Sequence, residues 1–169
     1  DPVYLGTLQT RALGVIGVAV SPAGLRGVHL FLSGPENFLK LNRSLEEGEV
    51  EYSSRHTAVY LAEIQAYLEG RRRQFTLAVD WSGLTDFQTR VLQETARIPY
   101  GETRSYGEIA AAVDKPKAAR AVGQAERANP APLVIPCHRV IGADGSLTGY
   151  GGKAGTATKA WLLDFEKSR

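Results

Sequence analysis

The sequence predicts an α/β protein with a small N-terminal sheet-plus-helix domain and a mainly helical C-terminal domain that carries a helix-turn-helix. Three observations support this prediction: β-rich runs dominate the first third, helical spacing dominates after Ser82-Gly83, and two short helical segments follow each other across a tight turn. We therefore expect an N-terminal α/β scaffold domain at 1–82 and a second domain at 83–169. The 169 residues, 43% of them hydrophobic, can form one ordinary core or two small ones.

The N-terminal half begins with three runs of β-forming residues, at 4–9, 13–20 and 25–32. The Ser-Pro-Ala-Gly sequence at 21–24 is typical of a turn and predicts a hairpin between the last two runs. Residues 33–55 are polar and mixed, and no element is predicted there. Apolar spacing over 56–68 predicts a helix that Gly70 ends, and the alternating residues 75–81 predict another strand.

The C-terminal half changes to helical spacing. Asp86 is expected to cap a helix that ends at the Ile-Pro-Tyr-Gly sequence of 98–101. A short helix over 105–113, a turn at 114–116 and a second helix to about Ala128 then predict a helix-turn-helix. Such pairs of helices also occur as plain packing units, so this feature alone favours DNA binding no more than packing.

Charge is distributed unevenly along the chain, although the formal net charge is only +2. Residues 1–84 contain 8 basic and 9 acidic residues, whereas 85–169 contain 12 and 9. Residues 115–139 contain one acidic residue, Glu126, and five basic residues: Lys115, Lys117, Arg120, Arg127 and Arg139. This excess suits a polyanion such as DNA, and it equally suits a solvated helical face.

The second helix of the pair has unusually small side chains, with four alanines and Gly123 between residues 118 and 125. Helices that recognise bases in the major groove normally carry long polar side chains. A slim helix permits close backbone approach to the narrow minor groove and predicts weak sequence reading. The same alanines can also serve only as helix formers packed against a neighbour.

No run of residues approaches the roughly 18 apolar positions that a membrane-spanning helix needs. The first residues also lack the basic and apolar regions of a secretory signal. We therefore expect a cytoplasmic protein that does not bind membranes.

The chain contains one cysteine, Cys137, which lies in the sequence Val-Ile-Pro-Cys-His-Arg-Val-Ile of 134–141. A single cysteine cannot form an internal disulfide or a cysteine-rich zinc site, and a lone cysteine is most often a small buried hydrophobe. A thiol attacks as the thiolate, which a base or a positive charge nearby favours, and His138 and Arg139 are residues of those types. Neighbours on a strand point to opposite faces, but Pro136 indicates that the run is irregular there.

Several separated motifs in the second half occur in one order. The sequence Pro-Cys-His-Arg-Val of 136–140 resembles the active-site signature of the O6-alkylguanine-DNA alkyltransferases, also called methylated-DNA-protein-cysteine methyltransferases. Pro-Tyr-Gly-Glu-Thr at 99–103, Ser-Tyr-Gly-Glu-Ile-Ala at 105–110 and Ala-Ala-Arg-Ala-Val-Gly at 118–123 resemble that family's DNA-binding helices. Asn129-Pro130, the Gly-Tyr-Gly-Gly of 149–152 and the residues from Trp161 to Glu166 resemble its asparagine turn, pocket loop and closing helix. The resemblance covers about 85–167 and is weak over 1–80.

The resemblance implies the repair of alkylated DNA by a direct, irreversible, single-turnover transfer. The O6-alkyl group of guanine would move to Cys137, with His138 as the base acting through a water and Glu166 orienting the imidazole, and O4-alkylthymine is a second candidate substrate. Asn129 would connect the recognition helix to the active-site segment. Tyr106 would donate to the flipped base or ease the rotation of the DNA backbone, and Arg120 would enter the duplex in place of the extruded nucleotide. Ala119, Ala121 and Gly123 would lie on the DNA-facing helix. The pocket would be lined by Pro132, Val140, Tyr150 and Gly151. Tyr106, Asn129 and Glu166, each taken alone, are more simply explained as packing or capping residues, and their joint occurrence favours the functional interpretation.

The resemblance has three departures. Gly151 stands where the family often has a serine, so a backbone N–H would have to replace a hydroxyl donor. The segment 153–159 is about two residues longer than usual. Some members bind structural zinc through N-terminal cysteines and histidines, whereas this chain has only His29 and His56 there. We expect no metal and no cofactor.

Three other functions compete with this interpretation. A cysteine hydrolase would need turnover and an acyl pocket, which no motif indicates. A damage sensor related to the alkyltransferases would lack the cysteine, and a helix-turn-helix regulator would carry longer base-reading side chains and a dimerisation element. The expected partner is double-stranded DNA containing O6-alkylguanine, bound through the minor groove, with no obligate protein partner.

Overall fold

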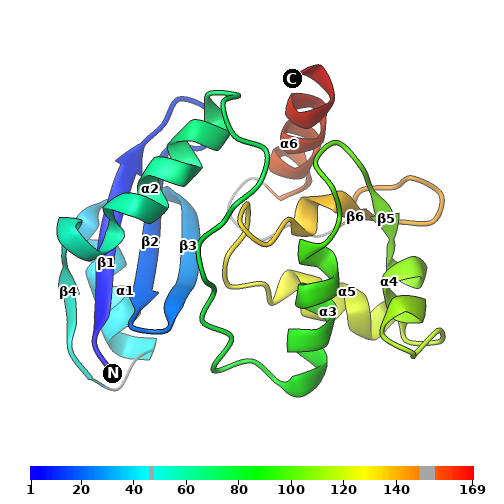
Figure 1. Ribbon diagram of the computed structural model, residues 1–169, viewed down its shortest axis with the longest axis horizontal. Helices are drawn as coiled ribbons and strands as arrows, with labels where there is room; N and C mark the ends of the chain where they lie inside the picture. The colour runs from blue at the N-terminus through cyan, green and yellow to red at the C-terminus, as the bar shows by residue number, and fades with distance from the viewer. Residues whose placement is uncertain (46–47, 149–154) are drawn as a thin grey trace. The chain divides into compact units, whose positions relative to one another are not determined.

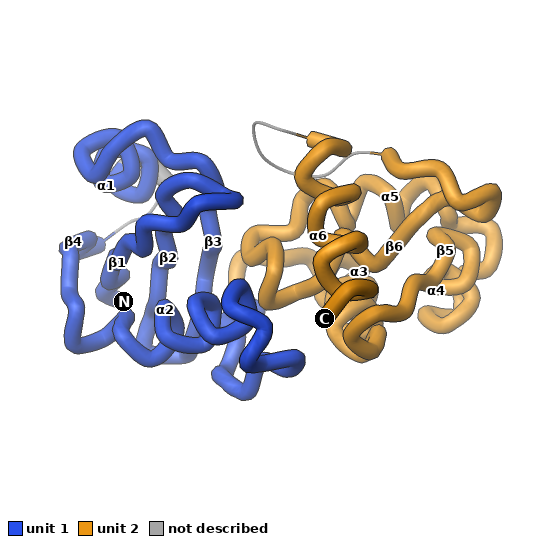
Figure 2. The backbone as a smooth tube through the Cα atoms, turned by 90° about the horizontal axis from the view of Figure 1, so that it is seen from above, with its two compact units in different colours: residues 1–81 blue, residues 82–169 orange. Residues whose placement is uncertain are grey.

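The chain folds as a mixed α/β protein, as the sequence predicts (Figure 1). The computed structural model describes residues 1–45, 48–148 and 155–169. These residues form two compact units, 1–81 and 82–169 (Figure 2). In the described part of the chain, every helix is too short or too polar to cross a bilayer.

The first unit is built on one four-stranded sheet in the order β3-β2-β1-β4. Strands β1 (Val3–Gln9), β2 (Val15–Ser21) and β3 (Gly24–Leu32) form an antiparallel meander, and β4 (Val50–Tyr52) pairs with β1 in parallel. The predicted hairpin between β2 and β3 is confirmed. The three predicted runs are therefore strands, with ends shifted by one or two residues.

Helices α1 (Pro35–Leu45) and α2 (Ser54–Leu68) cover opposite faces of this sheet. Phe38 of α1 packs with Leu5 of β1, and a Cβ on the next residue, Gly6, would lie 2.3 Å from Oγ1 of Thr57 in α2. Successive strand residues point to opposite faces, so glycine at position 6 permits the close approach of α2. Six of the seven residues of β2 are buried because both faces are covered.

Two sequence predictions for this unit need correction. Residues 75–81 do not form a strand, since the structure gives them one isolated parallel bridge, between Val79 and Leu25. The backbone N–H of Thr76 donates to Oε1 of Glu63 in α2, at 2.9 Å, and so takes a side-chain partner instead of a strand partner. The polar segment 33–55, for which no element is predicted, contains α1 and β4.

The second unit packs α3 (Asp86–Ala96), α4 (Tyr106–Ala112) and α5 (Ala119–Arg127) around a core that includes Val91, Ile109 and Val122. Helix α4, the turn after it and α5 form the predicted helix-turn-helix. The prediction that Asp86 caps α3 is wrong. Thr85 is the cap, because its hydroxyl accepts from the N–H of Gln88 at 3.1 Å and the Gln88 side chain accepts from the N–H of Thr85 at 3.0 Å.

The remaining elements of this unit hold the cysteine segment. A short helical turn, η1 (Cys137–Arg139), leads into β6 (Val140–Ile141), which pairs in parallel with β5 (Arg104–Ser105). This pairing ties the segment to the start of α4. Helix α6 (Thr156–Ser168) packs against η1, as does α3. Cys137 is thus held by elements that lie far apart in the sequence.

Candidate active site

The cysteine segment is fixed by the side chain of Asn129, which follows the end of α5. Its Nδ2 donates to the carbonyl of Ile135 at 2.9 Å, and its Oδ1 accepts from the N–H of Ala131 at 2.9 Å. An asparagine can bind a backbone carbonyl and a backbone N–H of a turn at the same time because its amide offers both donors and an acceptor. The side chain therefore joins the end of α5 to the residues just before Cys137.

Cys137 is buried, with 5% of its surface exposed. Burial raises the pKa of its thiol to about 12, and a negative charge on Glu126 acts in the same direction. Asn129 and the positive charge of Lys159 lower the pKa of the thiol but do not outweigh burial. In this closed arrangement the sulfur is a neutral thiol at physiological pH, so its activation requires a base.

His138 and Arg139 both bind the carboxylate of Glu166 in α6. Nε2 of His138 lies 2.8 Å from Oε2 of Glu166, and Nε and Nη2 of Arg139 donate to the two carboxylate oxygens at 2.8 and 2.9 Å. Arg139 also donates to the carbonyl of Ile98 at 2.7 Å, and the N–H of Gly101 donates to Oε1 of Glu166 at 3.2 Å. The three side chains are almost fully buried, which makes this a closed charged cluster.

The cluster determines the form of the imidazole. Burial lowers the pKa of His138, although the hydrogen bond to Glu166 opposes this. Arg139 already balances the Glu166 charge, so a neutral imidazole fits the site. A carboxylate only accepts hydrogen bonds, and Nε2 therefore carries the hydrogen while Nδ1 is the basic nitrogen. A neutral, oriented imidazole beside the cysteine in sequence has the properties of a general base.

Arg139 is not an exposed cation available to DNA, and the positive charge that lowers the pKa of the thiol is that of Lys159. Arg139 is 6% exposed and its guanidinium is bound to Glu166 and Ile98. Glu126, the acidic residue in the same basic segment, is also buried, at 4% exposed. The charged surface of this segment therefore consists of four exposed cations, Lys115, Lys117, Arg120 and Arg127, together with exposed Asp114.

Lys159 is a buried charged residue that sequence reasoning missed. It is 1% exposed, and its Nζ donates to the Tyr106 hydroxyl at 3.3 Å and to the carbonyl of Thr148 at 3.1 Å. The Tyr106 hydroxyl lies 3.1 Å from Oγ1 of Thr148. Helical spacing could have found Lys159, because it lies three residues before Leu162 and seven before Glu166, which places all three on one face of α6.

The helix proposed to face DNA has its inner face in the core and its outer face exposed. Val122 and Ala125 are buried, Arg120 and Ala121 are exposed, and Ala119 and Gly123 are half-buried. A Cβ on Gly123 would lie 3.8 Å from Cε1 of Tyr106, so this part of α5 packs beside the tyrosine ring. The structure thus leaves Arg120 accessible to a ligand.

The four residues expected to line the substrate pocket differ in what the structure describes. Pro132 is buried, and Val140 is fully buried in the core of the helical unit. Tyr150 and Gly151 lie outside the described residues, as do the first two residues of the longer segment 153–159. The structure therefore gives Val140 a packing role.

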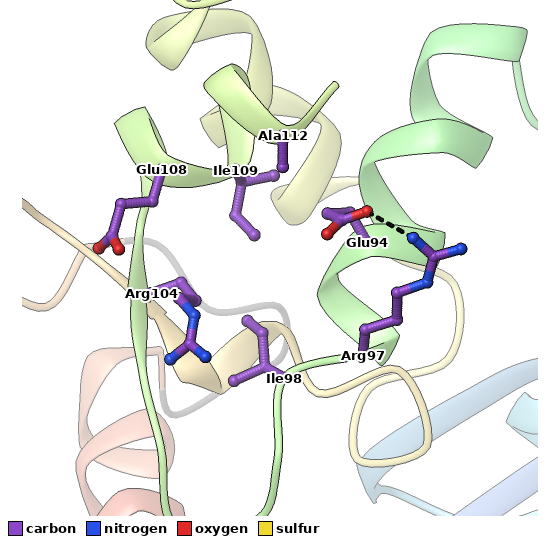
Figure 3. Close-up of a pocket in the computed structure, with 7 residues that line it drawn as sticks. All are labelled: Glu94, Arg97, Ile98, Arg104, Glu108, Ile109 and Ala112. Atoms are coloured by element: carbon purple, nitrogen blue, oxygen red, sulfur yellow. Dashed lines mark hydrogen bonds and ion pairs between the residues drawn. The ribbon is translucent and has the colours of Figure 1, made fainter. Parts of the chain in front are cut away.

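A separate pocket of the second unit is lined by the end of α3, by β5 and by one side of α4 (Figure 3). Its volume of about 220 Å³ is below the range of roughly 300–1,000 Å³ that is usual for ligand pockets. The ion pair of Glu94 with Arg97, at 3.0 Å, lies on its rim. None of the residues proposed for catalysis or DNA binding lines this pocket, which is formed by Glu94, Arg97, Ile98, Arg104, Glu108, Ile109 and Ala112.

Comparison with known proteins gives consistent results. Residues 86–168 match the family described as 6-O-methylguanine DNA methyltransferase, DNA binding domain. The inducible methylated-DNA–protein-cysteine methyltransferase of Bacillus subtilis is 53% identical over 108 residues, which cover 64% of this chain and 59% of that protein. The corresponding protein of Mycobacterium tuberculosis H37Rv is 54% identical over 107 residues, 63% of each chain. The aligned stretch thus spans less than two thirds of the length of these relatives.

The similarity of the fold extends over the whole chain. A crystal structure described as Mycobacterium tuberculosis OGT in complex with DNA superposes with a TM-score of 0.83 and 38% sequence identity, covering 98% of this chain and 94% of that one. A structure described as the O6-methylguanine methyltransferase of the same organism gives 0.81 and 38%, covering 99% and 94%. The chain belongs to the O6-alkylguanine-DNA alkyltransferase family.

Proposed function

We propose that this protein repairs alkylated DNA by transferring the O6-alkyl group of guanine irreversibly to Cys137, as a methylated-DNA–protein-cysteine S-methyltransferase. The observation that carries the proposal is the burial of the single cysteine next to a neutral His138 whose Nε2 is bound by Glu166. A buried thiol needs a base to react, and the adjacent histidine is held in the basic form. Transfer to O4-alkylthymine would use the same groups.

In the proposed reaction His138 removes the thiol proton through a water, and the thiolate sulfur attacks the alkyl carbon. A sulfur–carbon bond forms while the carbon–O6 bond breaks, and the electron pair of that bond goes to O6 of guanine. A proton from the Tyr106 hydroxyl neutralises the departing base. Tyr106 is suited to this role because Lys159 donates to its hydroxyl oxygen and thereby holds the hydroxyl in place as a donor. No second nucleophile is required, so each molecule reacts once.

The base must leave the helix before it reaches Cys137, because O6 of a stacked guanine is out of reach of a buried thiol. We propose that α5 enters the minor groove with its small residues Ala119, Ala121 and Gly123 close to the backbone. Arg120, which is exposed, would fill the space of the extruded nucleotide. The exposed cations of residues 115–127 would contact phosphates. A cytoplasmic location would give the protein access to cellular DNA, its proposed substrate.

The decisive experiment is the intact mass of the protein after incubation with duplex DNA that contains one O6-methylguanine. The expected result is a gain of one methyl group per protein, located on Cys137 by peptide mapping. Cys137→Ser should gain no mass and should still bind the duplex, because affinity comes mainly from phosphate contacts. Multiple turnovers, or demethylation of the DNA without a mass gain, would contradict the proposal and favour a hydrolase.

A further inference from the structure

Glu126 is a buried carboxyl on the inner side of α5 that the proposed reaction does not use. It is 4% exposed, and its Oε1 is in hydrogen-bond contact with the Thr95 hydroxyl of α3. Its Oε2 is buried and has no hydrogen-bond partner among the residues described. A buried carboxylate that is charged normally accepts several hydrogen bonds, whereas only one oxygen of Glu126 is in hydrogen-bond contact.

The contacts of Thr95 indicate where the proton lies. The Thr95 hydroxyl is also 3.0 Å from the carbonyl oxygen of Val91, one turn earlier in α3. A hydroxyl has a single proton to donate, whereas a backbone carbonyl and a carboxylate can only accept. Both contacts are satisfied at once if Thr95 donates to Val91 and a protonated Glu126 donates to the Thr95 oxygen. The geometry therefore favours a neutral carboxylic acid.

The groups around Glu126 support this assignment. From α6, Lys159 supplies the positive charge that acts on it, but the Lys159 ammonium is hydrogen-bonded to Tyr106 of α4 and to Thr148. In η1, a negative charge on Glu126 would raise the pKa of the Cys137 thiol, while the side chains of His138 and Arg139 are bound to Glu166. From α3, the group in contact with Glu126 is the neutral hydroxyl of Thr95. Burial raises the pKa of Glu126 to about 8, so the acid predominates at pH 7.

Glu126 is also connected to the cysteine segment through the backbone. Its carbonyl oxygen accepts from the N–H of Asn129 at 3.2 Å, and the Asn129 side chain in turn holds Ile135, two residues before Cys137. Helix α3 packs against both α5 and η1. A change of charge at position 126 therefore occurs in the same closed, weakly polar region as the sulfur.

We infer that Glu126 is a positioning residue that works as a neutral acid: it fixes the end of α5, which holds the cysteine segment through Asn129, without placing a negative charge near the forming thiolate. This inference rests on the proposed role of Cys137 as acceptor. Loss of the proton from Glu126 would place a like charge near the sulfur and disfavour the thiolate. Alkyl transfer should then decline on the alkaline side, where a thiol-based reaction would otherwise keep rising or level off.

The test compares the rate of benzyl transfer from free O6-benzylguanine in wild type, Glu126→Gln and Asp164→Asn between pH 6 and 9.5. Glutamine keeps the shape of the neutral acid and cannot ionise, and Asp164 is an exposed carboxylate of α6 that serves as a control. Glu126→Gln should react like wild type near pH 6 and about tenfold faster at pH 9, where about one tenth of Glu126 would keep its proton. Asp164→Asn should follow wild type throughout.

Parallel pH profiles of Glu126→Gln and wild type would overturn the inference while adduct formation on Cys137 still supported the proposed function. No benzyl adduct on Cys137 in any of the proteins would instead contradict the proposed function. A second measurement needs no variant: the carboxyl ¹³C shift of Glu126 in wild type should titrate with a midpoint near 8. A midpoint near 4.5 would show a carboxylate at neutral pH and overturn the inference.

Discussion

Nε2 of His138 and Oε2 of Glu166 lie 2.8 Å apart in a site where both side chains are almost fully buried. The contact joins the residue after Cys137 to a helix that begins 18 positions later, at Thr156. Because the carboxylate accepts the Nε2 hydrogen, the opposite ring nitrogen is left as the base. The proposed chemistry of Cys137 depends on this arrangement.

Replacing the proposed base should change the pH dependence of transfer. His138→Ala leaves a thiol whose pKa burial has raised, so the reaction with O6-benzylguanine should fall by about 10²–10⁴-fold near pH 7. Much of that loss should be recovered at alkaline pH, where hydroxide forms the thiolate. The rate is measured by intact mass at a series of pH values. Unchanged reactivity at pH 7 would exclude His138 from the reaction.

Replacing the exposed arginine of α5 should affect duplex DNA more than a free base. Arg120→Ala should slow repair of O6-methylguanine in a duplex at least tenfold more than it slows reaction with free O6-benzylguanine. The reason is that unstacking costs a few kcal/mol and the free base does not pay it. Arg127→Ala, which removes another exposed cation of the same helix, is the matched control and should weaken DNA binding only. Equal slowing with both substrates would identify Arg120 as a phosphate contact or structural residue.

Breaking the buried ion pair should destabilise the protein. Glu166→Gln leaves Arg139 charged and buried with one fewer partner charge, which typically costs about 3–5 kcal/mol. The melting temperature should fall on the order of 10 °C. Glu102→Gln, which removes the partially exposed pair with Arg104, should change it by about 2 °C or less. Similar melting curves for the two variants would show that the cluster contributes little to stability.

The pH dependence of stability should report the protonation of Glu126. Its pKa is raised in the folded protein to about 8, whereas an unfolded chain titrates it near 4.5. The folded state therefore binds the proton more tightly, and this contribution is fully present below pH 4.5 and is lost as the pH rises to about 8. The melting temperature of Glu126→Gln minus that of wild type should increase from pH 5 to pH 8. A constant difference would indicate a carboxylate that titrates normally.

Alkylation of Cys137 should lower the stability of the protein. Cys137 is only 5% exposed, so a transferred alkyl group must occupy space that is already filled. Overpacking typically costs about 1–3 kcal/mol, which at roughly 2–4 °C per kcal/mol should lower the melting temperature by at least a few degrees. The benzylated protein should melt below the methylated one because its group is larger. If the alkylated forms melted at or above the free protein, the adduct would have to point into solvent.

Much of the fold follows from local sequence patterns. The runs at 4–9 and 25–32, the turn at 21–24 and the helical spacing over 105–113 each predict the element that the structure contains, because their periodicity and turn residues act locally. The strand predicted at 75–81 is wrong because Glu63 of α2 binds the backbone of Thr76. No pattern in the sequence predicts that contact, because it depends on the packing of α2, whose Glu63 lies 13 residues before Thr76.

The motifs that resemble the alkyltransferases indicate the family and the candidate residues from the sequence alone, since they consist of short runs in a fixed order. The sequence could not show that Arg139 would bind Glu166 instead of facing DNA or the thiol. It also could not show that Lys159 and Glu126 are buried, because their burial results from the packing of α3, α5 and α6.

The sequence by itself determined the kind of chemistry available, because a single thiol followed by a histidine and an arginine limits the nucleophile to Cys137 and names its candidate base. Only the tertiary structure decided the protonation states: a neutral thiol at Cys137, a neutral imidazole at His138 and a raised pKa at Glu126. The physical reason is that a protonation state depends on burial and on charges brought near in space. In this protein those charges come from two other helices, α5 with Glu126 and α6 with Lys159 and Glu166.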